Sequence, residues 1–260
     1  MTFHFFRTVT AFSLAIGLFS GSAWAFDYPD APRVDQVDDY FGTAVSDPYR
    51  WLEDADSEET KKWSAAQNQL SQDYLKTPER WHLRARLEQI WNYPRYGTPS
   101  KKGGFYYFWK NDGLQNQYVL YRSSTLKGPA QMMLDPNTLS KDGTVSIRAT
   151  AISDNGQYLA YGLSVAGSDE QVIQIRDLRT GKDLPDRIPG LRNASIDWLP
   201  DATALVYNRY PTQAEAPEAS PNTHNRVYKH TLGQPATQDR LLFSNPQEPD
   251  VDYYPEITDD

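Results

Sequence analysis

Serine is the first side chain to consider as a nucleophile, because the sequence contains no cysteine. Ser164 follows Gly162 at the spacing of a Gly-x-Ser-x-Gly nucleophile elbow, in which small flanking residues tolerate the strained turn that exposes the serine. Val165 and Ala166 follow it, so the second glycine is missing. No other serine has the elbow context. We therefore interpret Ser164 as a surface residue or a residue of a β-strand, and predict no catalytic nucleophile within this chain.

A second arrangement has the residue types of penicillin-binding enzymes. Ser124-x-x-Lys127, Ser153-Asp154-Asn155 and Arg179-Thr180-Gly181 occur in the order that those enzymes use. Their serine opens a helix that places the lysine one turn later, whereas Gly128-Pro129 would end such a helix at once. Ser153-Asp154-Asn155 leads into a glycine and is typical of a hairpin turn. The arrangement is therefore interpreted as coincidental.

The histidines are the candidate general bases and metal ligands. His82 lies on a predicted helix between Arg80 and Arg84, where a solvated or capping role fits it best. His224 and His230 flank a predicted strand, at an even spacing that could put both on one face. Neither a cysteine nor a well-spaced carboxylate completes a metal site around them. We predict neither a metal site nor a bound cofactor.

Two helices are predicted before residue 93, and they define an N-terminal helical segment over residues 26–92. Asp56 is predicted to cap the first helix, with Glu59 at the third helical position as in a capping box. Thr77 is predicted to cap the second, with Pro78 at its first position, where a missing N–H does no harm. The apolar stripes of the two helices are Trp63, Ala66, Leu70 and Tyr74, and Leu83, Leu87, Ile90 and Trp91. Nothing local can bury both stripes.

Short strands separated by glycine turns are predicted over residues 93–260. A strand, a turn at Asp154-Asn155-Gly156 and further strands make a four-stranded unit, and a related strand-turn-strand places Tyr207 at the position equivalent to Tyr161. Ile257-Thr258-Asp259-Asp260 repeats the start of the same turn. Four-stranded repeats of this length are typical of a β-propeller, whose blades bury their faces against neighbouring blades. An ordinary antiparallel sandwich is the alternative. About three blades are expected in this chain.

Residues 1–25 have the features of a signal peptide. Arg7 precedes an apolar run from Val9 to Phe19, which is too short to span a bilayer, and Ala23-Trp24-Ala25 has the form that signal peptidase cleaves. A buried first helix is the alternative. We expect the mature chain to begin near Phe26 and to be exported, most simply to a bacterial periplasm, with secretion from the cell as the other outcome. No other segment is apolar enough to span a membrane.

Charge and composition exclude some classes of partner. The formal net charge of the chain is −8. It becomes one unit more negative without residues 1–25, because Arg7 is the only charged residue there. Acidity of this degree argues against a nucleic-acid surface and favours solubility. Without cysteine, an exported chain must depend on its packed core rather than on disulfides.

Four groups of motifs follow one another along the chain. They are Asp47-Pro48-Tyr49-Arg50-Trp51-Leu52-Glu53-Asp54, Gly113-Leu114-Gln115-Asn116-Gln117 with Val119-Leu120-Tyr121, Leu134-Asp135-Pro136-Asn137 with Asp142-Gly143-Thr144, and Tyr161-Gly162-Leu163-Ser164 with Gly167-Ser168-Asp169. In this order they resemble the motifs of the prolyl oligopeptidase family, and the resemblance runs from Tyr28 to Asp260. The resemblance implies a serine peptidase that cleaves short peptides on the carboxyl side of proline. It also implies a seven-bladed propeller joined to an α/β-hydrolase domain, with no cofactor.

The resemblance implies where the parts of such a peptidase lie. The helical segment of residues 26–92 would pack on the hydrolase domain, and residues 93–260 would form the first propeller blades. The Ser-Asp-His triad would lie beyond Asp260, so no catalytic residue is expected in this chain. The propeller would restrict access to small peptides. The missing hydrolase domain and short proline-containing peptides are the expected partners.

One position departs from the family pattern. Asn193 stands nearest to the place, before Trp198, at which the family presents a phenylalanine towards substrate. A substrate role is therefore not assigned to Asn193, and the preference for proline depends on the domain beyond Asp260. Two alternatives stay open: a related oligopeptidase that prefers another residue, such as a basic one, and a non-catalytic, propeller-derived binding module.

Overall fold

The computed structural model describes residues 26–212, 214–217 and 222–258. The predicted signal peptide, and Asp259 and Asp260 of the predicted last turn, lie outside these ranges. The chain divides into two compact units between Arg84 and Ala85. This division falls inside the second helix, and the domain boundary predicted after residue 92 stays a prediction. The two units are described separately below.

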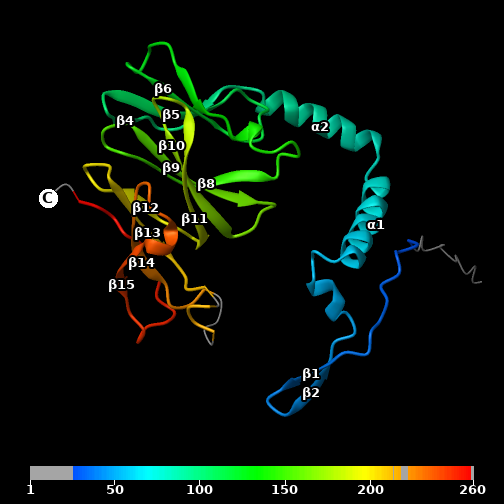
Figure 1. The fold of residues 1–260 in the computed structure, drawn as a ribbon. Helices are drawn as coiled ribbons and strands as arrows, with labels where there is room; N and C mark the ends of the chain where they lie inside the picture. Colours follow the sequence, from blue (N-terminus) through cyan, green and yellow to red (C-terminus); the bar gives the residue numbers. More distant parts are fainter. Residues whose placement is uncertain (1–25, 213, 218–221, 259–260) are drawn as a thin grey trace, which may run out of the picture. The chain divides into compact units, whose positions relative to one another are not determined.

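The N-terminal unit contains a hairpin, a short 3-10 helix and the first long helix (Figure 1). Strands β1 (Val37–Tyr40) and β2 (Thr43–Ser46) pair antiparallel. Helix η1 covers Arg50–Glu53 and helix α1 covers Glu58–Tyr74. Helix α2 (Pro78–Trp91) begins in this unit. In the described ranges, no helix combines the length and the apolar composition that crossing a bilayer requires.

The predicted cap of α1 is wrong by one residue. Ser57 is the N-cap, and its hydroxyl accepts a hydrogen bond from the backbone N–H of Thr60 at 3.2 Å. The Asp54 carboxylate accepts from the N–H groups of Asp56 and Ser57 at 3.1 and 3.2 Å. Asp56 therefore lies within a turn that Asp54 organises, before the helix starts. The cap predicted for α2 is confirmed, because the hydroxyl of Thr77 accepts from the Arg80 N–H at 3.2 Å.

The second unit consists mainly of three antiparallel sheets, which we call blades 1, 2 and 3. Each sheet is built from strands that follow one another along the chain, as the ribbon colours from green to red show (Figure 1). Blade 1 comprises β3 (Arg95–Tyr96), β4 (Ser100–Lys102), β5 (Phe105–Asn111), β6 (Val119–Ser123) and β7 (Gln131–Leu134), with β3 and β4 both paired to β5. The 3-10 helix η2 (Pro136–Thr138) follows blade 1.

Blades 2 and 3 have four strands each in simple up-and-down order. Blade 2 comprises β8 (Val145–Ile152), β9 (Tyr158–Val165), β10 (Glu170–Asp177) and β11 (Lys182–Arg192). Blade 3 comprises β12 (Ile196–Trp198), β13 (Ala204–Arg209), β14 (Arg226–Thr231) and β15 (Arg240–Ser244), with the 3-10 helix η3 (Ala236–Gln238) before β15. The chain is therefore mainly β and forms part of a propeller, as the sequence predicted.

Sequence pattern and turn chemistry explain these blades. Strand β10 alternates buried and partly exposed residues along its length, which matches the period of a strand with one buried face. Gly156 in the β8–β9 turn has φ of 67°, and Gly181 in the β10–β11 turn has φ of 71°. Glycine adopts this left-handed conformation without the steric penalty that a β-carbon brings. The hairpins therefore form where the glycine turns were predicted.

A separate apolar core joins each pair of neighbouring blades. Between blades 1 and 2 the core contains Tyr107, Leu120, Leu134, Leu159, Tyr161 and Leu178. Between blades 2 and 3 it contains Ile173, Ile175, Ile188, Leu191, Trp198, Leu205 and Tyr207, among others. Hydrogen bonds cross both interfaces: the Tyr107 hydroxyl donates to the Gly156 carbonyl, and the Trp198 indole N–H donates to the Ala151 carbonyl, each at 3.0 Å.

The predicted equivalence of Tyr161 and Tyr207 is confirmed. Each lies on the second strand of its blade, and each hydroxyl donates to a carboxylate near the start of the fourth strand. The acceptors are Asp183 at 2.9 Å and Asp239 at 2.7 Å. After β15 the described residues form no further strand, and the Ile257 N–H returns to the Asp197 carboxylate of blade 3 at 2.8 Å.

Candidate functional site

Ser164 lies in β9 and is completely buried. Its hydroxyl donates to the Ser168 carbonyl oxygen at 2.5 Å, across the turn that leads to β10. The backbone continues as a strand through Ser164 rather than turning into a helix, so the geometry of a nucleophile elbow is absent at this serine. Ser164 stabilises a hairpin and is not positioned to attack a substrate.

Ser124 and Ser153, which have the sequence order of penicillin-binding enzymes, also lie in turns or bends. Ser153 is buried, and its hydroxyl bonds to the Asn155 side chain at 2.8 Å and accepts from the Tyr158 N–H at 2.9 Å. Ser124 and Lys127 lie in the bends and turns after β6, where no helix forms. The helical geometry that would bring such a serine and lysine together is therefore absent.

His82, His224 and Asn193 lie in three different segments of the chain. His82 is exposed on α2. His224 precedes β14, and its Nδ1 lies 3.0 Å from the Thr223 hydroxyl. Asn193 follows β11 in a left-handed conformation with φ of 47°, and its carbonyl accepts from the Asn208 amide at 3.5 Å. Among the described residues, no group of three or more His, Asp or Glu is arranged to hold a metal ion.

His230 has the most unusual surroundings of the three histidines in the described ranges. It lies in β14 with its side chain fully buried. Its Nδ1 is 2.7 Å from the Asp239 carboxylate and its Nε2 is 3.1 Å from the Asp186 carboxylate. Asp186 belongs to blade 2, whereas Asp239 directly precedes β15 of blade 3. This cluster was not predicted from the sequence. Asp186 is 44 residues from His230 along the chain, and no local pattern marks Asp239, nine residues away, as its partner.

The surroundings of His230 change its acidity. Burial is the largest single effect and by itself lowers the pKa of His230, because it disfavours the charged ring. Hydrogen bonds to Asp239 and Asp186, together with their negative charge, act in the opposite direction and outweigh it. The pKa of His230 is therefore raised above its usual value of 6.5.

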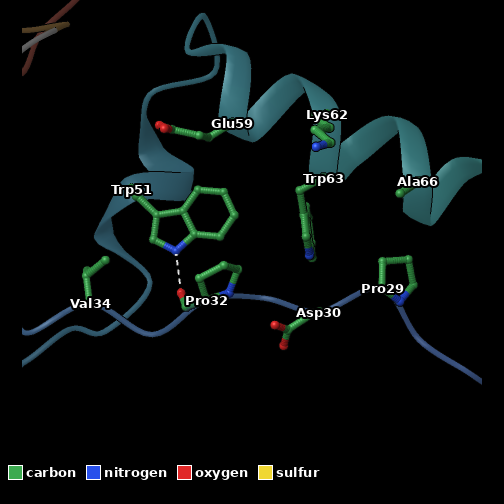
Figure 2. Close-up of a pocket in the computed structure, with 9 residues that line it drawn as sticks. All are labelled: Pro29, Asp30, Pro32, Val34, Trp51, Glu59, Lys62, Trp63 and Ala66. Carbon is green, nitrogen blue, oxygen red and sulfur yellow. Dashed lines mark hydrogen bonds between the residues drawn. The ribbon is translucent and has the colours of Figure 1, made fainter.

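The N-terminal unit contains an apolar groove of about 560 Å³ (Figure 2). Figure 2 shows the indoles of Trp51, from η1, and Trp63, from α1, above the segment of residues 29–34. The two rings meet edge to face, with their centroids 6.3 Å apart. The Trp51 N–H donates to the Pro32 carbonyl at 2.8 Å, which fixes one wall of the groove. Asp30, Glu59 and Lys62 supply the charged groups of its lining.

A second hollow, of about 500 Å³, lies between blades 1 and 2. Its lining combines aromatic and polar groups, including Tyr96, Trp109 and Tyr118 of blade 1 with Arg148 and Thr150 of β8. The Gln117 side chain holds the two blades together here, because it donates to the Val145 carbonyl at 2.7 Å and accepts from the Ile147 N–H at 3.3 Å. Aromatic faces beside exposed polar groups are suited to contact with a peptide.

The geometry therefore provides binding surfaces but, among the described residues, no assembled serine nucleophile and base. Comparisons with known proteins identify the family of the fold. Residues 29–260 match the family model described as "Prolyl oligopeptidase, N-terminal beta-propeller domain". A prolyl endopeptidase of Elizabethkingia meningoseptica is 40% identical over 235 residues, which are 90% of this chain and 33% of that protein. Prolyl oligopeptidase A of Galerina marginata is 35% identical, over 90% of this chain and 36% of that protein.

Solved structures show the same relationship. A structure from a study of two prolyl endopeptidases superimposes with a TM-score of 0.71 at 31% identity, covering 84% of this chain and 33% of that one. Prolyl oligopeptidase B of Galerina marginata, bound to a 25-residue macrocyclization substrate, superimposes with a TM-score of 0.68 at 29% identity, covering 88% of this chain and 35% of that one. The chain spans about a third of the length of these relatives.

Proposed function

Because the chain belongs to the prolyl oligopeptidase family, we propose that it is the N-terminal portion of an exported serine peptidase that hydrolyses short peptides on the carboxyl side of proline. The observation that carries this proposal is that all three blades, from Arg95 to Ser244, lie within residues 29–260, which the family model matches. In this proposal residues 26–92 belong to the hydrolase domain and residues 93–260 form the first blades.

The chemistry is assigned to a hydrolase domain beyond residue 260. A serine there attacks the carbonyl carbon of proline, a histidine takes the serine proton and returns it to the leaving amine, and an aspartate orients the histidine. Backbone N–H groups stabilise the oxyanion. The buried hydroxyl of Ser164 and the turn around Ser153 support this assignment, because neither serine is exposed beside a general base.

The described residues would serve binding and access. Propellers arrange their blades around a central channel, and β8, the first strand of blade 2, lies at one edge of its sheet. We propose that this edge lines the channel and that Arg148 and Thr150 face passing peptides. A channel of this kind would admit short peptides and exclude folded proteins. The exposed side chains of Leu83, Leu87 and Trp91 would pack on the hydrolase domain.

The decisive experiment starts from the complete coding sequence. We expect the codons after residue 260 to encode a Gly-x-Ser-x-Gly elbow followed by an aspartate and a histidine. The purified full-length protein should cleave a short peptide after an internal proline and leave the matched peptide with alanine at that position intact. Replacement of the elbow serine by alanine should abolish cleavage. A stop codon directly after residue 260 would favour the binding module, and cleavage after basic residues would favour the related oligopeptidase.

A separate assay addresses the selection of substrates by size. The same proline-containing sequence is offered as a short peptide and within a surface loop of a folded protein. We expect cleavage of the peptide alone, because the channel excludes the folded carrier. Equal cleavage of both would contradict the proposed role of the propeller while leaving the peptidase activity in place.

Export is tested independently of activity. We propose that residues 1–25 are removed and that the mature chain starts near Phe26. The protein is expressed in a bacterial host and isolated from its periplasmic fraction. Amino-terminal sequencing should then give a start at or near Phe26. A protein that keeps its initial methionine and remains with the cytoplasmic fraction would contradict export.

A further inference from the structure

The cluster around His230 joins two blades through side chains that solvent does not reach. The His230 side chain is fully buried, and the side chains of Asp186 and Asp239 are 2% and 3% exposed. Asp186 lies in β11 of blade 2, whereas His230 and Asp239 belong to blade 3. The imidazole is therefore held between a carboxylate of its own blade and a carboxylate of the neighbouring blade. This position is distinct from both hollows described above.

The two carboxylates require two donors from the ring. A protonated imidazole donates from both nitrogens, whereas a neutral imidazole has one N–H and one lone pair. The distances of 2.7 Å and 3.1 Å are those of hydrogen bonds on both sides of the ring. If the ring loses a proton, one carboxylate faces a lone pair, and the two repel each other. The observed arrangement therefore fits the doubly protonated ring.

The other groups that face the cluster are also accounted for. Strand β13 contributes the Tyr207 hydroxyl, which donates to the second oxygen of Asp239 at 2.7 Å. The turn after β14 contributes the Gly233 N–H, which donates to Asp186 at 2.6 Å. Arg209 of β13 pairs with Glu215 and lies over the Tyr228 ring. Each carboxylate thus keeps one neutral donor whatever the state of the ring.

We propose that His230, Asp186 and Asp239 form a pH-sensitive clasp between blades 2 and 3, which is closed when the imidazole carries both protons and opens when it loses one. Closure adds a charge-assisted hydrogen bond across the interface, and opening replaces it with a repulsive contact. The clasp acts on the fold of the propeller and does not depend on the proposed peptidase activity.

The direction of the pH effect follows from the acidity of the ring. The pKa of His230 is raised above 6.5 in the folded chain. A raised pKa means that the stabilisation is fully present below about pH 6.5 and is lost as the pH rises through the folded value. Between the two pKa values the folding equilibrium constant should fall by up to about tenfold for each pH unit.

The first test observes the ring itself in the unchanged chain. NMR spectra that correlate the ring nitrogens with their carbon-bound protons follow the histidines from pH 5 to pH 10. We expect His230 to keep both protons to a pH well above 6.5, the ordinary value for a histidine. A midpoint for His230 at or below 6.5 would overturn the proposal. This measurement requires no variant, so it remains decisive even where a substitution prevents folding.

The second test uses variants that separate titration from packing. His230→Gln removes the titrating group. The free energy of unfolding of the unchanged chain should decrease as the pH rises, and this decrease should be absent in the variant. Asp186→Asn offers an amide N–H to the lone pair of a neutral ring, so its stability should also become nearly independent of pH above neutrality. His82→Gln is the matched control and should keep the full slope. If either cluster variant keeps the slope of the unchanged chain, the proposal is wrong.

A third measurement locates the effect. Amide hydrogen exchange, corrected for the intrinsic dependence of exchange on pH, should accelerate in β11 and β14 as the pH rises through the midpoint of His230. Strands β5 and β6 of blade 1 should not change over the same range. Equal acceleration in all three blades would show that the ring controls global unfolding rather than a clasp between two blades, and would contradict the proposal.

Discussion

At the scale of single residues, blades 2 and 3 each contain a hydrogen bond from a tyrosine hydroxyl to a carboxylate, and the two carboxylates differ in their exposure to water. Asp183, the acceptor for Tyr161, also accepts from Nε and Nη2 of Arg176 at 2.7 and 3.0 Å, and its side chain is 30% exposed. Asp239, the acceptor for Tyr207, is nearly buried. Water can replace a lost hydroxyl at Asp183 but cannot readily reach Asp239. The two contacts should therefore respond differently to the same substitution.

Replacing each tyrosine by phenylalanine tests this difference. Tyr207→Phe should lower the free energy of unfolding by about 1.5–3 kcal/mol, the usual range for a hydrogen bond to a charged group. Tyr161→Phe should cost less, about 0.5–1.5 kcal/mol, because solvent and Arg176 still satisfy Asp183. Denaturant unfolding at pH 6 provides the measurement, with circular dichroism to check the fold. Equal losses for the two variants would show that burial of the acceptor does not decide the cost.

A second residue-scale effect concerns acid stability. The Arg209 guanidinium binds Glu215 through two hydrogen bonds, at 2.7 and 2.8 Å, and it lowers the pKa of that carboxyl from 4.5 to about 2, against the opposing effect of burial. A lowered pKa contributes stability that is present above about pH 4.5 and is lost as the pH falls towards 2. The contribution should be modest and sensitive to salt, because the Glu215 side chain is 36% exposed.

The variant Glu215→Gln isolates this contribution. It should be less stable than the unchanged chain at pH 7, and the difference should vanish as the pH approaches 2. Thermal unfolding at several pH values and at low and high salt provides the measurement. Glu58→Gln, which changes an exposed carboxylate 3.5 Å from Lys61, is the control and should have little effect. A difference for Glu215→Gln that stays constant down to pH 2 would contradict the ion-pair explanation.

At the scale of elements, the sequence predicted turns and strands better than helix starts. Glycine turns such as Asp154-Asn155-Gly156 mark the hairpins directly, because only glycine adopts their backbone conformation without strain. The start of α1 was predicted one residue early, because Asp54, Asp56 and Ser57 can all cap a helix. The choice of Ser57 depends on the turn that Asp54 forms before it, and that turn is a property of the folded backbone.

The β4–β5 turn of blade 1 makes an element-scale prediction. Gly103 has φ of 54°, and its N–H donates to the Asp154 carbonyl at 2.8 Å. A β-carbon at this position would lie 2.1 Å from the Asn155 carbonyl oxygen. Gly104 has φ of 84° and open space around it. Gly103→Ala should therefore push the hairpins of blades 1 and 2 apart, whereas Gly104→Ala carries only the backbone strain of about 1–2 kcal/mol.

The comparison of the two alanine variants separates strain from close approach. We expect Gly103→Ala to lower the melting temperature clearly more than Gly104→Ala, and to increase hydrogen exchange in the β8–β9 turn. Both variants carry an alanine at positive φ, so any excess effect of Gly103→Ala reports the contact between blades. Equal melting temperatures would show that the interface between blades 1 and 2 yields easily at this point.

At the scale of the whole molecule, the propeller pattern could be predicted while the contacts between blades could not. Strand alternation and turn residues are local signals, so the sequence indicated four-stranded units directly. The hydrogen bond from Trp198 to Ala151 and the contact of Asp186 with His230 each join residues of different blades. No local pattern encodes such a pair. The same limit explains why His230 was interpreted as one of two weak metal candidates rather than as the centre of a buried cluster.

The outer edge of blade 3 leads to the last prediction. Strand β15 pairs only with β14 among the described strands, and Leu241, Leu242 and Phe243 are all exposed in it. An apolar strand with one unpaired edge provides a template on which another chain can add a strand. The chain of residues 26–260 alone should therefore aggregate as its concentration rises.

Leu242→Lys tests whether the edge strand drives that aggregation, since a charge on an edge strand opposes pairing with a second strand. We expect this variant to stay in solution at concentrations at which the unchanged chain aggregates, as light scattering measures. Leu126→Lys is the matched control, because Leu126 is more exposed, at 66% against 44% for Leu242, but lies in a turn. If exposure alone causes aggregation, Leu126→Lys should reduce aggregation more than Leu242→Lys does. The edge-strand explanation requires the opposite order, because only β15 offers unpaired backbone groups beside its apolar side chains.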